Sequence, residues 1–301
     1  MSATRSAANP STRSAAGEHP TAVFIHVPKT GGSTINGIIN RQYPRNGIVG
    51  VGFNHLASQE RFLAMSPREK AEVRCLRGHV AFGIQDALPG PYCLITLLRD
   101  PVARFLSEYK HLAGRGSRVV SYPPEALASL EAHLEYRVAG NSLNLQTAQI
   151  SGYLSADIVE GKRLDPLPDD ALARALANLE AFDIPGVLDR FDECLLLMKR
   201  RLGWRKPVVS IRKNMAVKGA RKFTPSAQLR EEIARQAAPD LTLYRRALEL
   251  IDQRIAAEGD DFAGELARLR RANHLLFRTQ KVYEAVLPKN LRRAGRKLLG
   301  R

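Results

Sequence analysis

The chain has 301 residues, of which 44% are hydrophobic and 25% are charged, and its formal net charge is +16. This is the composition of a globular protein, with enough apolar residues for one large domain or two small ones. No run of about eighteen apolar residues occurs, so we expect no transmembrane helix. The positive charge favours an anionic partner such as a nucleotide, an acidic glycan, a nucleic acid or an anionic lipid.

The ends of the chain and its cysteines set the expected organisation. Residues 1–20 are small and polar, which predicts a disordered tail. Residues 21–257 carry the patterning of a folded enzyme domain, and residues 258–301 form a basic helical extension. The cysteines share an apolar context and lack metal-ligand spacing: Cys75, Cys93 and Cys194. They indicate core residues in a reducing compartment rather than zinc ligands.

The first strong segment reads AVFIHVPKTGGSTIN. Its β-branched and aromatic beginning predicts a buried strand that ends at Pro28, which has no amide hydrogen for a central ladder. Two glycines then allow a tight turn, and Ser33 and Thr34 can cap a helix that begins near Ile35. Amides at a helix N-terminus attract anions, and Lys29 adds a positive charge, so a phosphate-type site is expected. The lysine precedes the glycines, which is not the order of a Walker A loop.

Apolar runs and helix-start signals predict further strands and helices along the chain. Strands are expected at residues 22–27, 48–53, 73–76, 92–98 and 183–188. Helices are expected at 33–42, from Pro67, from Pro101 with Asp100 as its cap, and at 123–140, 169–180, 191–202, 226–236, 241–258 and beyond 261. This alternation predicts an α/β fold with a parallel central sheet flanked by helices on both faces.

A second anion-binding pattern, LLRDPVARFLSEY, spans residues 97–109. Arg99 follows an expected strand, and ligands in open α/β sheets bind at the carboxyl ends of the strands. An arginine offers a fork of donors to a phosphate, and Ser107, two turns into the next helix, adds a hydroxyl. Alone, Arg99 and Asp100 are equally consistent with a salt bridge at a strand end.

A histidine follows the third expected strand, in the sequence RGHV. This is His79, and a histidine that titrates near neutral pH can take the proton of an attacking hydroxyl, although a lone histidine is more often structural. His26 lies within the first expected strand, which favours a packed residue. His55, His111 and Glu108 are weaker candidates for the base.

These motifs together resemble the carbohydrate sulfotransferases related to heparan sulfate 2-O-sulfotransferase. HVPKTGGS is similar to their 5′-phosphosulfate loop, the R-D-P junction with its following serine to their 3′-phosphate motif, and GHV to the segment that carries their catalytic base. The resemblance covers about residues 21–257. It implies a P-loop-like nucleotide-binding fold and 3′-phosphoadenosine 5′-phosphosulfate (PAPS) as co-substrate.

The resemblance also assigns roles to individual residues of this chain. It places the 5′-phosphosulfate on Lys29, Thr30, Gly31, Gly32, Ser33 and Thr34, the 3′-phosphate on Arg99 and Ser107, and the catalytic base on His79. In this family a late basic loop closes over the 3′-phosphate, so Arg212, Lys213 and Lys218 in SIRKNMAVKGARK are further candidates. Asn144 and Gln146 resemble a polar segment that lines the acceptor cleft.

The resulting hypothesis is a PAPS-dependent sulfotransferase that moves a sulfuryl group to a hydroxyl of a carbohydrate. Lys29 would stabilise charge on the leaving oxygen, so no metal is expected. One alternative is a kinase with an atypical phosphate loop, which needs Mg²⁺ and acidic ligands, and Asp100 is the nearest carboxylate. Another is a non-enzymatic protein that binds an anionic polymer or a membrane. The sequence lacks an aromatic–basic recognition motif, so no nucleic-acid partner is expected.

The extension at residues 258–301 alternates basic residues with leucines. Such a helix either packs on its own domain, which is the commoner case, or lies on an anionic membrane. The Golgi members of the resembling family carry a membrane anchor that is missing here, so we expect a cytoplasmic enzyme, with peripheral contact to an anionic membrane as the alternative.

Overall fold

A computed structural model describes residues 19–51, 55–115, 122–153, 165–210 and 224–286. Five strands form one sheet in the order β2-β3-β1-β4-β5, and every neighbouring pair is parallel. The strands are β1 (Thr21–Ile25), β2 (Ile48–Val51), β3 (Cys75–Gly78), β4 (Tyr92–Leu98) and β5 (Ile184–Val187). The predicted α/β fold with a parallel sheet is confirmed.

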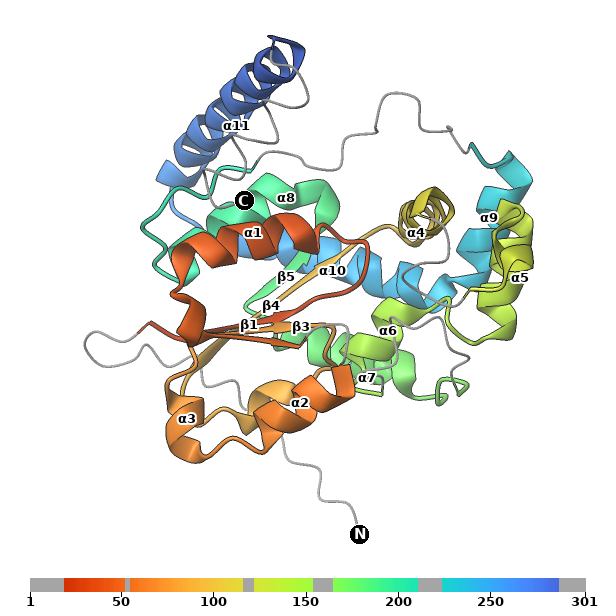
Figure 1. Ribbon diagram of the computed structural model, residues 1–301, viewed down its shortest axis with the longest axis horizontal. Helices are drawn as coiled ribbons and strands as arrows, with labels where there is room; N and C mark the ends of the chain where they lie inside the picture. Colours follow the sequence, from red (N-terminus) through yellow and green to blue (C-terminus); the bar gives the residue numbers. More distant parts are fainter. Residues whose placement is uncertain (1–18, 52–54, 116–121, 154–164, 211–223, 287–301) are drawn as a thin grey trace.

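Helices cover both faces of this sheet, with α1 and α8 on one face and α2 and α3 on the other (Figure 1). The helices of the first half are α1 (Gly32–Gln42), α2 (His55–Leu63), α3 (Pro67–Ala71), α4 (Pro101–Arg115), α5 (Leu130–Ala139) and α6 (Leu145–Ile150). Those of the second half are α7 (Ala171–Glu180), α8 (Phe191–Arg201), α9 (Ala227–Gln236), α10 (Ala238–Ala256) and α11 (Asp261–Val286). Short 3-10 turns include η2 (Ile84–Ala87), η3 (Pro124–Leu127) and η5 (Leu188–Arg190).

Two helix starts, those of α3 and α4, follow the predicted capping signals. Ser66 forms a complete capping box with Glu69 before α3, and the carboxylate of Asp100 accepts from the amide of Ala103 at 2.8 Å at the start of α4. Both caps satisfy amides that a helix N-terminus leaves without intrahelical partners.

Three predicted boundaries are wrong for local reasons. The helix expected at 123–140 is interrupted, because Ser129 caps a new helix, α5, behind the turn η3. Pro239 does not separate two helices but lies in the first turn of α10, where a missing amide hydrogen costs nothing. Strand β3 lies two residues later than expected and ends directly before His79.

The core surrounds the central strand β1, whose residues Ala22 to Ile25 are at most 1% exposed. Helices α8 and α10 pack against β5. Helix α11, the described part of the basic extension, is attached to α8 by ion pairs of Arg200 with Asp261 and Glu265, and its Leu269 joins the core. No helix in the described ranges is long and apolar enough to cross a membrane.

Candidate active site

The loop after β1 turns sharply because two of its residues adopt the left-handed backbone conformation. Lys29 has φ 70° and Gly31 has φ 93°, and Gly31 is the N-cap residue of α1. The helix therefore begins at Gly32, and the prediction that Ser33 or Thr34 would cap a helix beginning near Ile35 is wrong. A β-carbon on Gly31 would also lie 2.8 Å from Leu188, the first residue of the turn η5 that follows strand β5.

The loop can offer backbone amides to an anion, but fewer than predicted. The amide of Thr34 already donates to the carbonyl of Gly31 at 3.0 Å. The hydroxyl of Thr30 is buried and donates to the carbonyl of Val27 at 2.8 Å, so that side chain points inward. Among the described residues, no backbone carbonyl accepts from the amides of Gly31, Gly32 or Ser33. These amides and the Lys29 ammonium are what this loop can present to a sulfate or phosphate group.

The second glycine of the loop is required by a histidine beneath it. A β-carbon on Gly32 would lie 1.8 Å from Nε2 of His26. The ring of His26 thus fills the place that any other side chain at position 32 would need. The sequence motif HVPKTGG is therefore partly a packing unit, in which the first residue fixes the identity of the last.

Arg99 lies beside this loop, as the two-site hypothesis requires. Its Nη1 donates to the carbonyl of Lys29 at 3.1 Å. Its backbone is held by Gln146, which accepts from the Arg99 amide and donates to the Arg99 carbonyl, both at 2.9 Å. Burial lowers the pKa of Arg99, partly offset by the carboxylates of Asp189 and Asp100, and an arginine remains charged in such a setting. Ser107 lies half-buried two turns along α4.

His79 and His26 lie side by side because their strands are in register. Ile25 pairs with Gly78, so the next residue of each strand is a histidine. Their rings stack with centroids 4.3 Å apart. Nδ1 of His79 lies 2.7 Å from the carbonyl of His26, and since a carbonyl only accepts, Nδ1 carries the hydrogen. In the neutral ring, Nε2 is then the nitrogen with the lone pair, as a general base requires.

His26 remains uncharged in this pair. Burial lowers its pKa well below the ordinary value, and the positive charges of His79, Arg77 and Lys29 lower it further. The expectation that His26 is a packed residue agrees with this environment. Of the two stacked rings, His79 therefore stays the candidate base.

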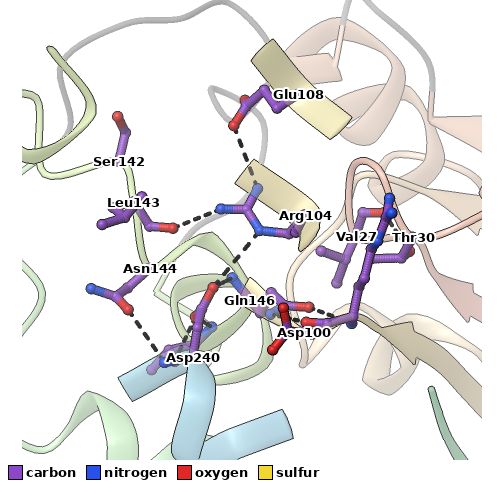
Figure 2. A network of polar contacts seen from close by, with 12 residues as sticks. Val27, Thr30, Asp100, Arg104, Glu108, Ser142, Leu143, Asn144, Gln146 and Asp240 are labelled. Carbon is purple, nitrogen blue, oxygen red and sulfur yellow. Dashed lines mark hydrogen bonds and ion pairs between the residues drawn. The ribbon is translucent and has the colours of Figure 1, made fainter. Parts of the chain in front are cut away.

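The surroundings of Glu108 do not favour it as the catalytic base. Glu108 pairs with Arg104 and Arg137, at 3.7 and 3.5 Å, and is 9% exposed. Burial alone would raise the pKa of Glu108, but Arg137 and Arg104 bring it below the ordinary value. Figure 2 shows Arg104 between Glu108, the carbonyl of Leu143 and Asp240. A carboxylate in such a network stabilises the fold and is a poor base.

The predicted acceptor-cleft residues are occupied by structural contacts. The amide of Asn144 donates to the carbonyl of Gln236 and accepts from the backbone of Asp240, and Gln146 is fully buried against Arg99. A third amide of this segment, Gln149, donates to the carbonyls of His26 and Val80 and was not predicted. Nothing in its sequence context distinguished it, because its partners are backbone atoms far away in the chain.

Some predicted residues lie outside the described part of the chain. These are Arg212, Lys213 and Lys218 of the late basic loop, and the side chain of His55. In the described ranges, no three His, Cys, Asp or Glu residues gather in a way that could hold a metal ion.

Comparison with known proteins adds the family. Residues 2–288 match the family model of galactose-3-O-sulfotransferases. The chain belongs to the galactose-3-O-sulfotransferase family. It is 26% identical over 283 residues to galactose-3-O-sulfotransferase 3 of Bos taurus, across 87% of this chain and 64% of the relative. The identity to the Homo sapiens protein of the same name is also 26%, over 207 residues, or 62% of this chain and 46% of that protein.

This membership confirms a carbohydrate sulfotransferase family and disfavours the kinase and the non-enzymatic binding protein. The family model is that of the galactose enzymes, not of the heparan sulfate enzymes to which the motifs were compared. The chain spans 64% or less of the length of these two curated relatives.

Proposed function

We propose that this protein transfers a sulfuryl group from PAPS to the 3-hydroxyl of a galactose residue in a glycan. The observation that carries the proposal is the contact between Arg99 and Lys29, at 3.1 Å, because it joins the two anion-binding motifs at one edge of the sheet. The donor has phosphate-type groups at both ends of one nucleoside and needs two such sites as neighbours. The galactose acceptor is inferred from the family and from the names of the relatives.

The reaction follows from what each residue can do. The acceptor oxygen attacks sulfur, and the bond between sulfur and the 5′-phosphate oxygen breaks. The hydroxyl proton passes to Nε2 of His79, whose other nitrogen donates to the His26 carbonyl. Lys29 and the amides of Gly31 to Ser33 stabilise the charge that develops on the leaving phosphate. The products are the 3-O-sulfated galactoside and adenosine 3′,5′-bisphosphate.

Arg99 and Ser107 would bind the 3′-phosphate and so fix the line of attack. Positioning of this kind supplies much of the rate in group transfers where the protein forms no covalent bond. The late basic loop, with Arg212, Lys213 and Lys218, remains a candidate for closing over the nucleotide. The resemblance of the GHV motif to the heparan sulfate enzymes supports only the role of His79 as the base, not a heparan sulfate acceptor.

The test is transfer of label from ³⁵S-PAPS to acceptors that differ at one position. We expect sulfation of a β-galactoside and no sulfation of the matched 3-deoxygalactoside, with the sulfated carbon located by mass spectrometry and NMR. A desulfated heparan oligosaccharide tests the other acceptor class, and ATP with Mg²⁺ tests the kinase. Sulfation of the heparan acceptor alone, or phosphorylation in place of sulfation, would overturn the proposal.

A further inference from the structure

Helix α6 lies beneath both halves of the proposed site. It contains only Leu145–Ile150, and all six residues are buried. Two of them, Gln146 and Gln149, are three positions apart and so lie on neighbouring turns of one face. Buried glutamines are uncommon, because each amide must find partners for its donors and acceptor.

Gln146 contacts the half of the site that contains Arg99. Its side-chain amide makes two hydrogen bonds to the backbone of that one residue, one to the amide and one to the carbonyl. This pairing copies the hydrogen bonding of an adjacent strand just beyond the end of β4. It fixes the backbone from which the Arg99 guanidinium extends.

Gln149 contacts the half that contains His79. Its Nε2 donates to the carbonyl of His26 at 3.1 Å and to the carbonyl of Val80 at 2.8 Å. One of these bonds is next to His79 in the chain, and the other is to the very oxygen that accepts from His79 Nδ1 at 2.7 Å. Gln149 therefore holds both the backbone after His79 and the acceptor that sets the tautomer of its ring.

The oxygen of the Gln149 amide shows that this geometry costs free energy of folding. Oε1 of Gln149 is buried and has no hydrogen-bond partner among the described residues. An unpaired buried acceptor costs about 1 to 3 kcal/mol. A leucine or methionine of similar size would avoid that cost but would take away the donor to the carbonyls of His26 and Val80, so the glutamine is accounted for by its two donor contacts.

The helix itself is held in one position. The carboxylate of Asp240 accepts from the backbone amides of Gln146 and Thr147, at 3.3 and 2.8 Å, and from the Thr147 hydroxyl at 2.9 Å. The side chain of Asp240 is 0% exposed. A rigidly seated helix can transmit its position to two side chains, which a mobile loop cannot do.

We propose that α6 is a brace that aligns the two halves of the active site, with Gln149 a positioning residue for His79 and Gln146 a positioning residue for Arg99. The inference rests on the proposed function in that it takes His79 as the base and Arg99 as the ligand of the 3′-phosphate. It assigns each glutamine to a different measurable property. Gln149 acts on proton removal, and Gln146 acts on nucleotide binding.

The experiment compares Gln149→Met, Gln146→Met and the control Gln85→Met. Gln85 is also buried, but it accepts from Gly83 within its own turn. Three properties are measured in each: kcat and KM for sulfate transfer, affinity for adenosine 3′,5′-bisphosphate by calorimetry, and the ¹⁵N shifts of the His79 ring. The His79 signals are assigned by their loss in His79→Asn.

We expect a separation of effects. Gln149→Met lowers kcat about ten-fold and removes the Nδ1-protonated signature of His79, while bisphosphate affinity stays within about two-fold. Gln146→Met lowers bisphosphate affinity about ten-fold and leaves the His79 signature intact. Gln85→Met changes none of the three. Gln149→Glu should give the same loss of kcat and of the His79 signature, because a carboxylate of the same size cannot donate to two carbonyls. This variant replaces Gln149→Met if the methionine variant does not fold.

Two results would overturn the brace. One is an unchanged kcat and His79 signature in both Gln149 variants. The other is a parallel change of all properties in the Gln146 and Gln149 variants, which would mean that α6 is only a structural support. Absence of sulfate transfer by the unaltered protein would instead refute the proposed function. The measurements of the His79 tautomer and of bisphosphate affinity need no turnover. They therefore still decide whether Gln149 positions His79 and Gln146 positions Arg99.

Discussion

The guanidinium of Arg99 donates a hydrogen bond to the backbone carbonyl of Lys29 at 3.1 Å, across 70 residues of chain. The bond uses one donor of the arginine and the carbonyl of a residue whose φ is 70°. It therefore ties the strained position in the phosphate loop to the end of the neighbouring strand. The loop after β1 and the junction after β4 are therefore joined by a direct hydrogen bond.

The strained backbone at Lys29 leads to the first prediction. A residue other than glycine in the left-handed region costs about 1 to 2 kcal/mol, which is partly returned by the greater freedom of glycine in the unfolded chain. Lys29→Gly should therefore leave the free energy of unfolding unchanged or raise it by up to about 1 kcal/mol. The same variant should lower kcat about 100-fold, because the ammonium that stabilises the leaving group is lost. Urea denaturation and labelled-donor transfer measure the two effects.

Asn141 supplies the matched control for this variant. It is the other described non-glycine residue with positive φ, at 51°, and it is exposed. Asn141→Gly should change stability in the same direction and leave transfer intact. If Lys29→Gly lost activity only in proportion to a loss of stability, the lysine would be a structural residue and not part of the charge stabilisation.

The glycines of α1 give the second prediction. Gly32→Ala places a β-carbon 1.8 Å from His26 Nε2, so the ring must move, and we expect a loss of about 1 to 3 kcal/mol in stability together with loss of transfer. A β-carbon on Gly37, in the same helix, would meet no described atom within 4 Å outside the helix's own backbone. Gly37→Ala should raise stability by about 0.5 to 1 kcal/mol without affecting transfer. Equal stability of the two variants would contradict the packing role of His26.

The sequence was sufficient to predict the sheet and the location of the two anion-binding motifs. The apolar runs of β1 and β4 are long enough to be recognised, and both motifs follow them directly, so parallel pairing must bring them to one edge. The capping signals at Ser66 and Asp100 are local, and they were predicted for the same reason.

The hydrogen bonds that hold the site residues in place could not be predicted in this way. Gln149 bonds to His26 across 123 residues, and Asp240 bonds to Thr147 across 93. Neither pairing leaves a periodic or local signal in the sequence. The structural contacts of Asn144 with α9 and α10, and of Glu108 with Arg137 of α5, were not predicted for the same reason, since only the folded chain brings these helices together.

The tautomer of His79 leads to the third prediction. His79→Asn keeps a side chain that can donate to the His26 carbonyl but cannot act as the base. We expect kcat to fall about 100-fold or more, and the acid limb of the pH–rate profile to disappear, with bisphosphate affinity retained. His111→Asn, which replaces the rival histidine on α4, should keep the wild-type profile. The reverse pattern would transfer the role of base to His111.

The fourth prediction concerns the buried ion pairs of Glu108. Its pKa is below the ordinary value of 4.5 in the folded protein, since Arg137 and Arg104 outweigh the effect of burial. An acid with a lowered folded pKa adds stability above its unfolded pKa, and that stability is lost as the pH falls toward the folded pKa. Glu108→Gln should therefore be less stable by about 3 kcal/mol at neutral pH, because two buried arginines lose the negative charge of this carboxylate. Below pH 4.5 the difference from wild type should shrink.

Urea denaturation at neutral and at acidic pH measures this difference, with Glu232→Gln as the control. Glu232 also pairs with an arginine, Arg235, but on the exposed surface of α9, where solvent screens the pair and its removal should change little. Transfer activity adds a second criterion. At a temperature where Glu108→Gln is folded, its kcat should stay near that of wild type, because the carboxylate supports the fold under the site and takes no proton from the acceptor. A large loss of kcat in the folded variant would restore Glu108 as the base and remove His79 from that role.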